Sequence, residues 1–226
     1  MDWSPLLISI KTALTATLIT FFLGILAADK ILKTRGQVCR ILDSIFTLPL
    51  VLPPTVAGFF LLVLFGKNGP LGRLFACFNI QIVFRWPATV IAAVIVAFPL
   101  MYRSAKAALE QVDENLIYAA RTLGIPEIKI FWKITIPQAL PGIISGGILA
   151  FTRALGEFGA TIMIAGNIPK VTQTIPVAIY MAVQGNRTDR AAVWVILIVT
   201  MSFMVVYFLN YQPNRKKKLS RKERKE

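Results

Sequence analysis

The residues of this chain that could do chemistry are few, and they exclude most catalytic sites. Histidine is absent, and Cys39 and Cys77 lie far apart without forming a CxxC motif. These facts remove the common zinc sites and every catalytic triad that uses His. Arg153 and Glu157 lie inside an apolar segment, four residues apart, where they can pair on one helix face. The pair is a candidate for the wall of a polar path, and a salt bridge between helices is the alternative.

Nucleotide chemistry is also missing from the sequence. The segment Gly66-Lys67-Asn68 lacks the preceding glycine and the following Ser or Thr of a phosphate-binding P-loop. We therefore expect no bound cofactor and no metal, with any ATP and Mg²⁺ held by a separate subunit. A membrane-embedded enzyme is a remote alternative, because it needs a nucleophile–base pair or metal ligands that we do not find.

The composition is that of a membrane protein. Of 226 residues, 56% are hydrophobic and 16% are charged, against about 25% charged in a soluble domain. Segments long and apolar enough to cross a bilayer are expected at about 12–28, 41–65, 87–102, 141–163 and 191–211. Pro49, Pro53 and Pro54 interrupt the second segment, which should bend there. The bend is a candidate gate, and a passive kink is the alternative. The fold class is therefore an all-α, polytopic transmembrane helix bundle.

Residues 164–190 do not fit a simple span, because polar residues and Pro176 interrupt them. Non-helical backbone at membrane depth survives only within protein or beside a cavity. We expect a broken or re-entrant segment here, so the bundle has five spans plus this segment. A full sixth span is the alternative.

The distribution of positive charge predicts the orientation. The net charge is +14, and Lys and Arg gather at 29–40, 103–138 and 213–226. The positive-inside rule then places the N-terminus outside and the C-terminus in the cytoplasm. We expect a multi-pass transmembrane domain at 1–212 and a basic cytoplasmic tail at 213–226 that touches anionic lipid. The tail has no aromatics to stack on bases, so no nucleic-acid partner is expected.

The polar loop at about 112–137 is periodic. Its apolar residues recur at helical spacing, Asp113 can cap a helix start, and Gly124 fits just past a helix end. Pro126 can open a second helix, which Pro137 and Pro141 are expected to end. The prediction is a helix–glycine–helix elbow that fits a groove in a cytoplasmic partner. The alternative is a hairpin that lies on the lipid headgroups.

The same loop resembles the EAA loop of ABC importer permeases, written E-A-A-x3-G-x9-I-x-L-P. The matching positions are Tyr118, Ala119, Ala120, Gly124, Ile134, Ile136 and Pro137, with Tyr in place of Glu and Ile in place of Leu. The resemblance implies that the loop docks in a cleft of an ATPase subunit. The residues that it assigns to coupling are Tyr118, Ala119, Ala120, Arg121, Leu123, Gly124, Ile134 and Pro137.

A second resemblance covers nearly the whole chain. Residues 153–161, 165–169, 172–180 and the proline-rich run at 48–54 resemble permeases of molybdate importers. This implies a homodimer that works with two ATPase subunits and an extracytoplasmic molybdate-binding protein. Sulfate, thiosulfate or tungstate import and a stand-alone channel are the alternatives. Candidates for the path or gate are Pro53, Pro54, Arg153, Gly156, Glu157, Gly159 and Thr161.

Overall fold

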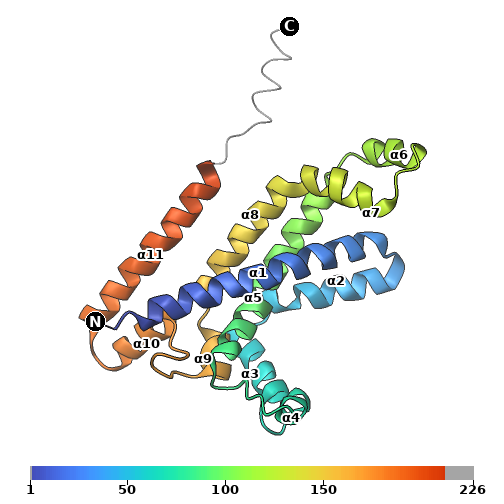
Figure 1. Cartoon of the computed structure of the whole chain (residues 1–226). Helices are drawn as coiled ribbons and strands as arrows, with labels where there is room; N and C mark the ends of the chain where they lie inside the picture. The colour runs from blue at the N-terminus through green and yellow to red at the C-terminus, as the bar shows by residue number, and fades with distance from the viewer. Residues whose placement is uncertain (1, 212–226) are drawn as a thin grey trace.

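The computed structural model describes residues 2–211, which form helices and connecting loops (Figure 1). The basic tail expected at 213–226 lies outside the described residues. The long helices are α1 (Ser4–Lys33), α5 (Trp86–Glu110), α8 (Ile136–Leu155) and α11 (Thr188–Tyr211). The shorter helices are α2 (Gly36–Val51), α3 (Pro54–Phe65), α4 (Pro70–Ala76), α6 (Glu114–Thr122), α7 (Glu127–Ile130), the π-helical turn η1 (Phe131–Thr135), α9 (Gly159–Ala165) and α10 (Ile175–Gln184).

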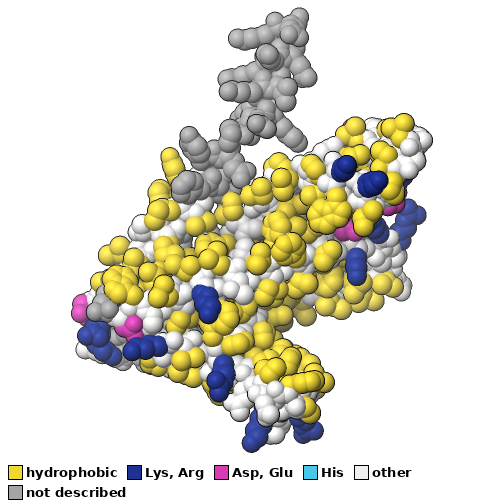
Figure 2. Space-filling view, viewed as in Figure 1, with side chains coloured by type: hydrophobic (Ala, Val, Ile, Leu, Met, Phe, Trp, Pro, Cys, Tyr) yellow, Lys and Arg dark blue, Asp and Glu magenta, His cyan; other side chains and the backbone are white. Residues whose placement is uncertain are grey.

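The prediction of a polytopic helical membrane protein is confirmed. Among the described residues, four helical stretches are long and apolar enough to span a bilayer, and the bent pair α2 and α3 makes a fifth. Figure 2 shows hydrophobic side chains over the flanks of the long helices, with most Lys and Arg near the ends of the molecule. Helices α6 and α7 lie at one end, which we call the loop end, and the N-terminus lies at the other (Figure 1).

Helix α5 is the centre of the bundle, packed between α1 and α8. Its Ala97, Met101, Tyr102 and Ala105 are fully buried. Glycines let the neighbours approach: a Cβ on Gly146 of α8 would lie 2.5 Å from the Ser104 Cβ of α5. Helices α8 and α5 therefore cross closely at a glycine.

The second span bends at Pro53 and Pro54 as predicted, whereas Pro49 lies inside α2 and does not end the helix. Helices α2 and α3 meet at 113° across the break. Pro53 is extended, as the residue before a proline prefers. Pro54 then opens α3 at a position where a backbone N–H is not needed.

The predicted fourth span was wrong at both ends. Helix α8 begins at Ile136 and ends at Leu155, so 141–163 is not one helix. The helix ends at its C-cap, Gly156. The Glu157 carboxylate Oε1 then accepts the backbone N–H of Ala160 at 2.8 Å, in the first turn of the separate helix α9.

The prolines expected to end the elbow do not end it. Pro137 lies in the first turn of α8, where its missing N–H is harmless, and Pro141 lies within the helix. The turn η1 joins α7 to α8 without a loop, so helical backbone runs from Glu127 to Leu155. The sequence pattern gave no sign of this π-helical turn.

Residues 164–190 form a broken segment, as predicted. The apolar helix α10 has ten residues, about half the length that a span needs. The loop before it is held by protein: Ser9 Oγ accepts the Ile175 N–H at 2.8 Å, and Thr172 Oγ1 accepts the Ile168 N–H at 3.0 Å. These bonds hold the loop, and α10 is too short to form a sixth span.

The contact between α3 and α9 depends on Gly58. A Cβ at this position would lie 2.7 Å from the Ala160 Cα and 2.8 Å from the Met163 Cβ, so Gly58→Ala must push the helices apart. We expect the free energy of unfolding to fall by about 1–3 kcal/mol, measured by thermal unfolding in detergent. Gly156→Ala is the control, because its Cβ would meet only the Thr152 carbonyl at 3.7 Å. Equal stability of the two variants would contradict this packing.

Candidate functional site

The elbow at the loop end is built by local hydrogen bonds. Asp113 Oδ1 caps α6 by accepting the Asn115 N–H at 2.9 Å. At the other end of α6, Gly124 has φ +71°. The N–H groups of Gly124 and Ile125 donate to the carbonyls of Arg121 and Ala120, at 3.0 and 3.1 Å. This is a Schellman motif, and it explains why the loop needs glycine at this position.

The two arms of the elbow are tied together by an ion pair. Arg121 Nε lies 2.6 Å from Glu127 Oε1, and Nη2 lies 3.2 Å from Oε2. The carboxylate raises the pKa of the Arg121 guanidinium above its usual value. Because both side chains are exposed, the pair fixes geometry more than it adds stability.

The elbow presents an apolar surface on its outside. Exposed fractions are 79% for Leu123, 69% for Ile128, 60% for Trp132 and 54% for Tyr118. Exposed apolar patches of this kind mark interaction sites. We call these four residues the elbow face. Sequence reasoning assigned Tyr118 and Leu123 to coupling but did not assign Ile128 or Trp132.

The other residues that the resemblance assigns to coupling have different positions in the elbow. Ala119 is exposed, whereas Ala120 is 3% exposed and packs inward. Ile134 lies in η1, and Pro137 lies in the first turn of α8, where they belong to the base of the elbow. The Tyr118 hydroxyl lies 3.4 Å from Glu114 Oε2, and the Arg121 guanidinium lies 5.8 Å from the Tyr118 ring centre. Tyr118 therefore has partners within α6 itself.

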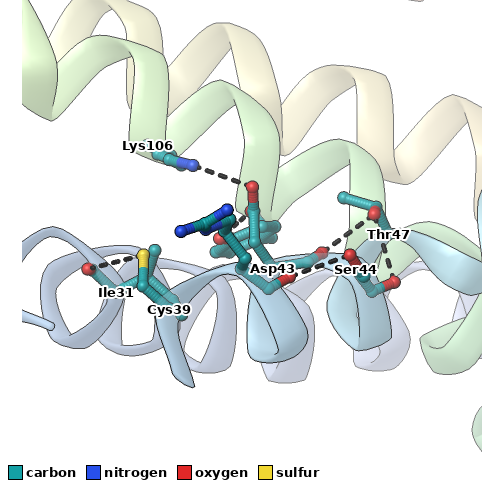
Figure 3. Close-up of polar contacts among 8 residues, drawn as sticks. Ile31, Cys39, Asp43, Ser44, Thr47 and Lys106 are labelled. Atoms are coloured by element: carbon teal, nitrogen blue, oxygen red, sulfur yellow. Dashed lines mark hydrogen bonds and ion pairs between the residues drawn. The ribbon is translucent and has the colours of Figure 1, made fainter. Parts of the chain in front are cut away.

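Near the loop end, a polar cluster joins α2 to α5. Sequence reasoning did not predict it. Asp43 of α2 accepts hydrogen bonds from the buried Tyr102 hydroxyl and from Lys106 Nζ, the latter at 3.1 Å (Figure 3). Sequence spacing could not reveal it, because its members are far apart in the chain.

The residues proposed for a path or gate meet where α8, α9 and α3 approach. Arg153 Nη1 pairs with Glu157 Oε2 at 2.9 Å, and Glu157 is 3% exposed. A Cβ on Gly159 would lie 3.0 Å from the Pro54 Cβ, so the start of α9 rests on the bend after Pro53. Thr161 is buried, and Gly156 is exposed in the break. Within residues 2–211, no group of three His, Cys, Asp or Glu is placed to hold a metal.

Comparison with known proteins agrees with this architecture. Residues 20–215 match the family model described as "Binding-protein-dependent transport system inner membrane component". The molybdenum transport system permease protein ModB of Escherichia coli K12 is 44% identical over 87% of both chains. YvgM of Bacillus subtilis, also named for molybdenum transport, is 43% identical over 92% of both chains.

A solved structure shows the same fold at low sequence identity. The match is a chain of a bacterial alginate ABC transporter in complex with an alginate pentasaccharide-bound periplasmic protein. It has a TM-score of 0.72 and 18% identity, and the match covers 93% of this chain and 79% of that chain. Together with the family match and the close relatives, these findings show that the chain belongs to the binding-protein-dependent inner-membrane components of transport systems.

Proposed function

We propose that this chain is the permease subunit of an ATP-driven molybdate importer. The observation that carries the proposal is the elbow: a capped helix, a glycine turn and a second short helix that expose an apolar face between two spans. The names of the relatives that are more than 40% identical favour molybdate as the cargo. The family is one of transport components, which leaves a membrane-embedded enzyme without support.

The elbow face is the proposed docking site for an ATPase. Its large apolar side chains are exposed on a loop whose backbone is held by the Schellman motif and the Arg121–Glu127 pair. Each chain offers one elbow, and a pair of ATPase subunits offers two clefts, so the working unit is a homodimer with two ATPases. The ATPase subunits bind ATP and Mg²⁺. The elbow transmits the movement of the ATPase to α8.

The charge distribution favours one orientation of the chain in the membrane. Basic residues near the loop end, including Lys33, Arg103 and Lys129, favour a cytoplasmic elbow. The N-terminus then faces outward and the C-terminus faces the cytoplasm. An extracytoplasmic molybdate-binding protein docks on the side opposite the elbow, and the solved relative in complex with a periplasmic protein supports such a partner.

The gate is proposed at the contact of α3 with α9. Pro53 and Pro54 fix the bend, and Gly159 lets the start of α9 lie against it. Gly156 and the buried Thr161 flank the break between α8 and α9. Glu157 is committed to Arg153 and to the Ala160 N–H, so this pair holds the gate in position and does not itself carry the anion.

Uptake by reconstituted protein tests the function directly. Proteoliposomes that contain the permease, its ATPase and the binding protein should accumulate labelled molybdate only with ATP. Unlabelled tungstate should compete, because it is a tetrahedral dianion of similar chemistry. Stronger competition by sulfate or thiosulfate than by molybdate itself would assign another cargo, and ATP-independent flux would indicate a channel.

The glycine of the elbow is tested by Gly124→Val. A β-branched side chain is strained at φ +71°, at a cost of about 1–2 kcal/mol. The variant should insert normally, yet its ATPase co-purification and uptake should both fall. Gly36→Val is the matched control, because Gly36 has φ +76° and is the first residue of α2, outside the elbow. Normal uptake by the Gly124 variant would count against the coupling role.

Two substitutions distinguish a structural role of Glu157 from direct contact with the anion. Glu157→Gln keeps a carbonyl oxygen for the Ala160 N–H, whereas Glu157→Ala leaves that buried donor and Arg153 unpaired. We expect the Ala variant to lose about 1–3 kcal/mol of unfolding free energy and the Gln variant to lose less, measured by thermal unfolding. Asp29→Asn breaks the exposed pair with Lys33 and should cost under about 0.5 kcal/mol. Reduced uptake with unchanged stability in both Glu157 variants would indicate contact with the anion instead.

A further inference from the structure

The polar cluster of Asp43, Tyr102 and Lys106 holds α2 to the central helix of the bundle. Across its whole described range, α2 buries no residue, and its main neighbour is α5. Among the described residues, two kinds of side-chain hydrogen bond join α2 to another helix. One is the pair of bonds to Asp43, and the other is a weak bond from Cys39 Sγ to the Ile31 carbonyl at 3.7 Å (Figure 3). The position of α2 therefore depends strongly on Asp43.

Asp43 is held at two points of α5. Tyr102 is fully buried, and its hydroxyl donates to Oδ1 of Asp43. Lys106 lies about one turn further along the same face of α5, and its Nζ donates to Oδ2 at 3.1 Å. The Tyr102 ring also packs edge-on against Phe46 of α2, with the ring centres 5.3 Å apart. Because each carboxylate oxygen takes one donor, the cluster fixes where α2 lies along the axis of α5.

Stability alone is a weak reason for a charged cluster at this position. Asp43 and Lys106 both lie in helices that are apolar enough to form spans, and their side chains are 37% and 24% exposed. Taking two charges partly out of water costs much of what their attraction returns. Ionisable side chains within spans are rare and mark functional positions by default.

The two helices that the cluster joins lead to the elbow and to the proposed gate. Helix α5 ends about one turn beyond Lys106, and Asp113 then caps α6. Helix α2 leads into the bend at Pro53 and Pro54, beyond which α3 lies against α9. The cluster is thus a direct polar contact between the helix that enters the elbow and the helix that enters the bend.

We propose that Asp43, Tyr102 and Lys106 are positioning residues that couple the elbow to the gate. The inference rests on the proposed importer function and deepens it, because it names the side chains through which movement of the ATPase reaches the bend. When the elbow moves α5, the two hydrogen bonds to Asp43 make α2 follow. The bend then converts the movement of α2 into a displacement of α3 against α9. The three residues act in this way without contacting the anion.

The ratio of ATP hydrolysed to molybdate transported tests this coupling in the reconstituted complex of permease, ATPase and binding protein. Asp43→Ala removes both hydrogen bonds and should raise the ratio at least about fivefold, the lower end of the usual coupling between two sites. ATP hydrolysis should persist, because the elbow still docks. Tyr102→Phe keeps the ring against Phe46, Lys106→Met keeps most of the side-chain length, and each should raise the ratio by less.

Two further variants serve as the rescue and the control. Asp43→Glu keeps a carboxylate for both donors and should restore a ratio close to that of the wild type. Ser44→Ala removes the neighbouring side chain of α2, whose hydroxyl bonds to the Arg40 carbonyl within the same helix. Its ratio should equal that of the wild type.

The double variant Tyr102→Phe with Lys106→Met separates coupling from simple anchoring. It leaves Asp43 without either donor, so its ratio should match that of Asp43→Ala. It also decides the outcome if Asp43→Ala fails to assemble, because it leaves no buried hydroxyl unpaired. An unchanged ratio in the double variant would overturn the inference, even with lowered thermal stability or with equal loss of uptake and hydrolysis, because the cluster would then only anchor α2.

The wild-type complex distinguishes failure of this inference from failure of the proposed function. ATP-dependent molybdate uptake by the wild type, together with unchanged ratios in the variants, would reject the coupling role alone. A wild-type complex without ATP-dependent uptake would reject the importer function, and this inference would fail with it.

Discussion

The packing of α5 against α1 and α8 is the interaction on which the rest of the structure depends. Small residues let backbones approach closely, and in a bilayer such close contact replaces the hydrophobic effect as the source of helix association. Met101 and Tyr102 of α5 are fully buried at this junction. The same helix leads directly into Asp113 and the elbow. A push on the elbow therefore acts on the most firmly packed helix of the bundle.

A second constraint is that polar groups at membrane depth must find partners within protein. The chain breaks its helices at Pro53 and at Gly156, and each break is stabilised locally. Glu157 caps α9 while pairing with Arg153, and Ser9 of α1 accepts the first N–H of α10. Broken helices can shift more readily than intact spans, which suits a path that must open on alternate sides. The elbow and the break at Gly156 thus lie at opposite ends of α8, which connects them.

The features that the sequence could predict are those encoded locally. The cap at Asp113, the turn at Gly124 and the bend after Pro53 each follow from the conformational preference of one residue. The errors arose where several residues compete: Pro137 and Pro141 were expected to stop a helix that the turn η1 carries through. Contacts between distant segments, such as that of Asp43 with Tyr102, could not be derived from spacing. The resemblance proposed which residues take part in coupling, but only the fold showed that Ala120 is buried whereas Leu123 is exposed.

The central claim is that the elbow face lies on the cytoplasmic side and is bound by the ATPase. Leu123 is 79% exposed, so Leu123→Cys, made after Cys39 and Cys77 are replaced by Ser, gives one reporter on that face. A membrane-impermeant maleimide should label it in inside-out vesicles but not in right-side-out vesicles, and bound ATPase should block the labelling. Labelling from the outer side, or equal labelling with and without the ATPase, would contradict the account.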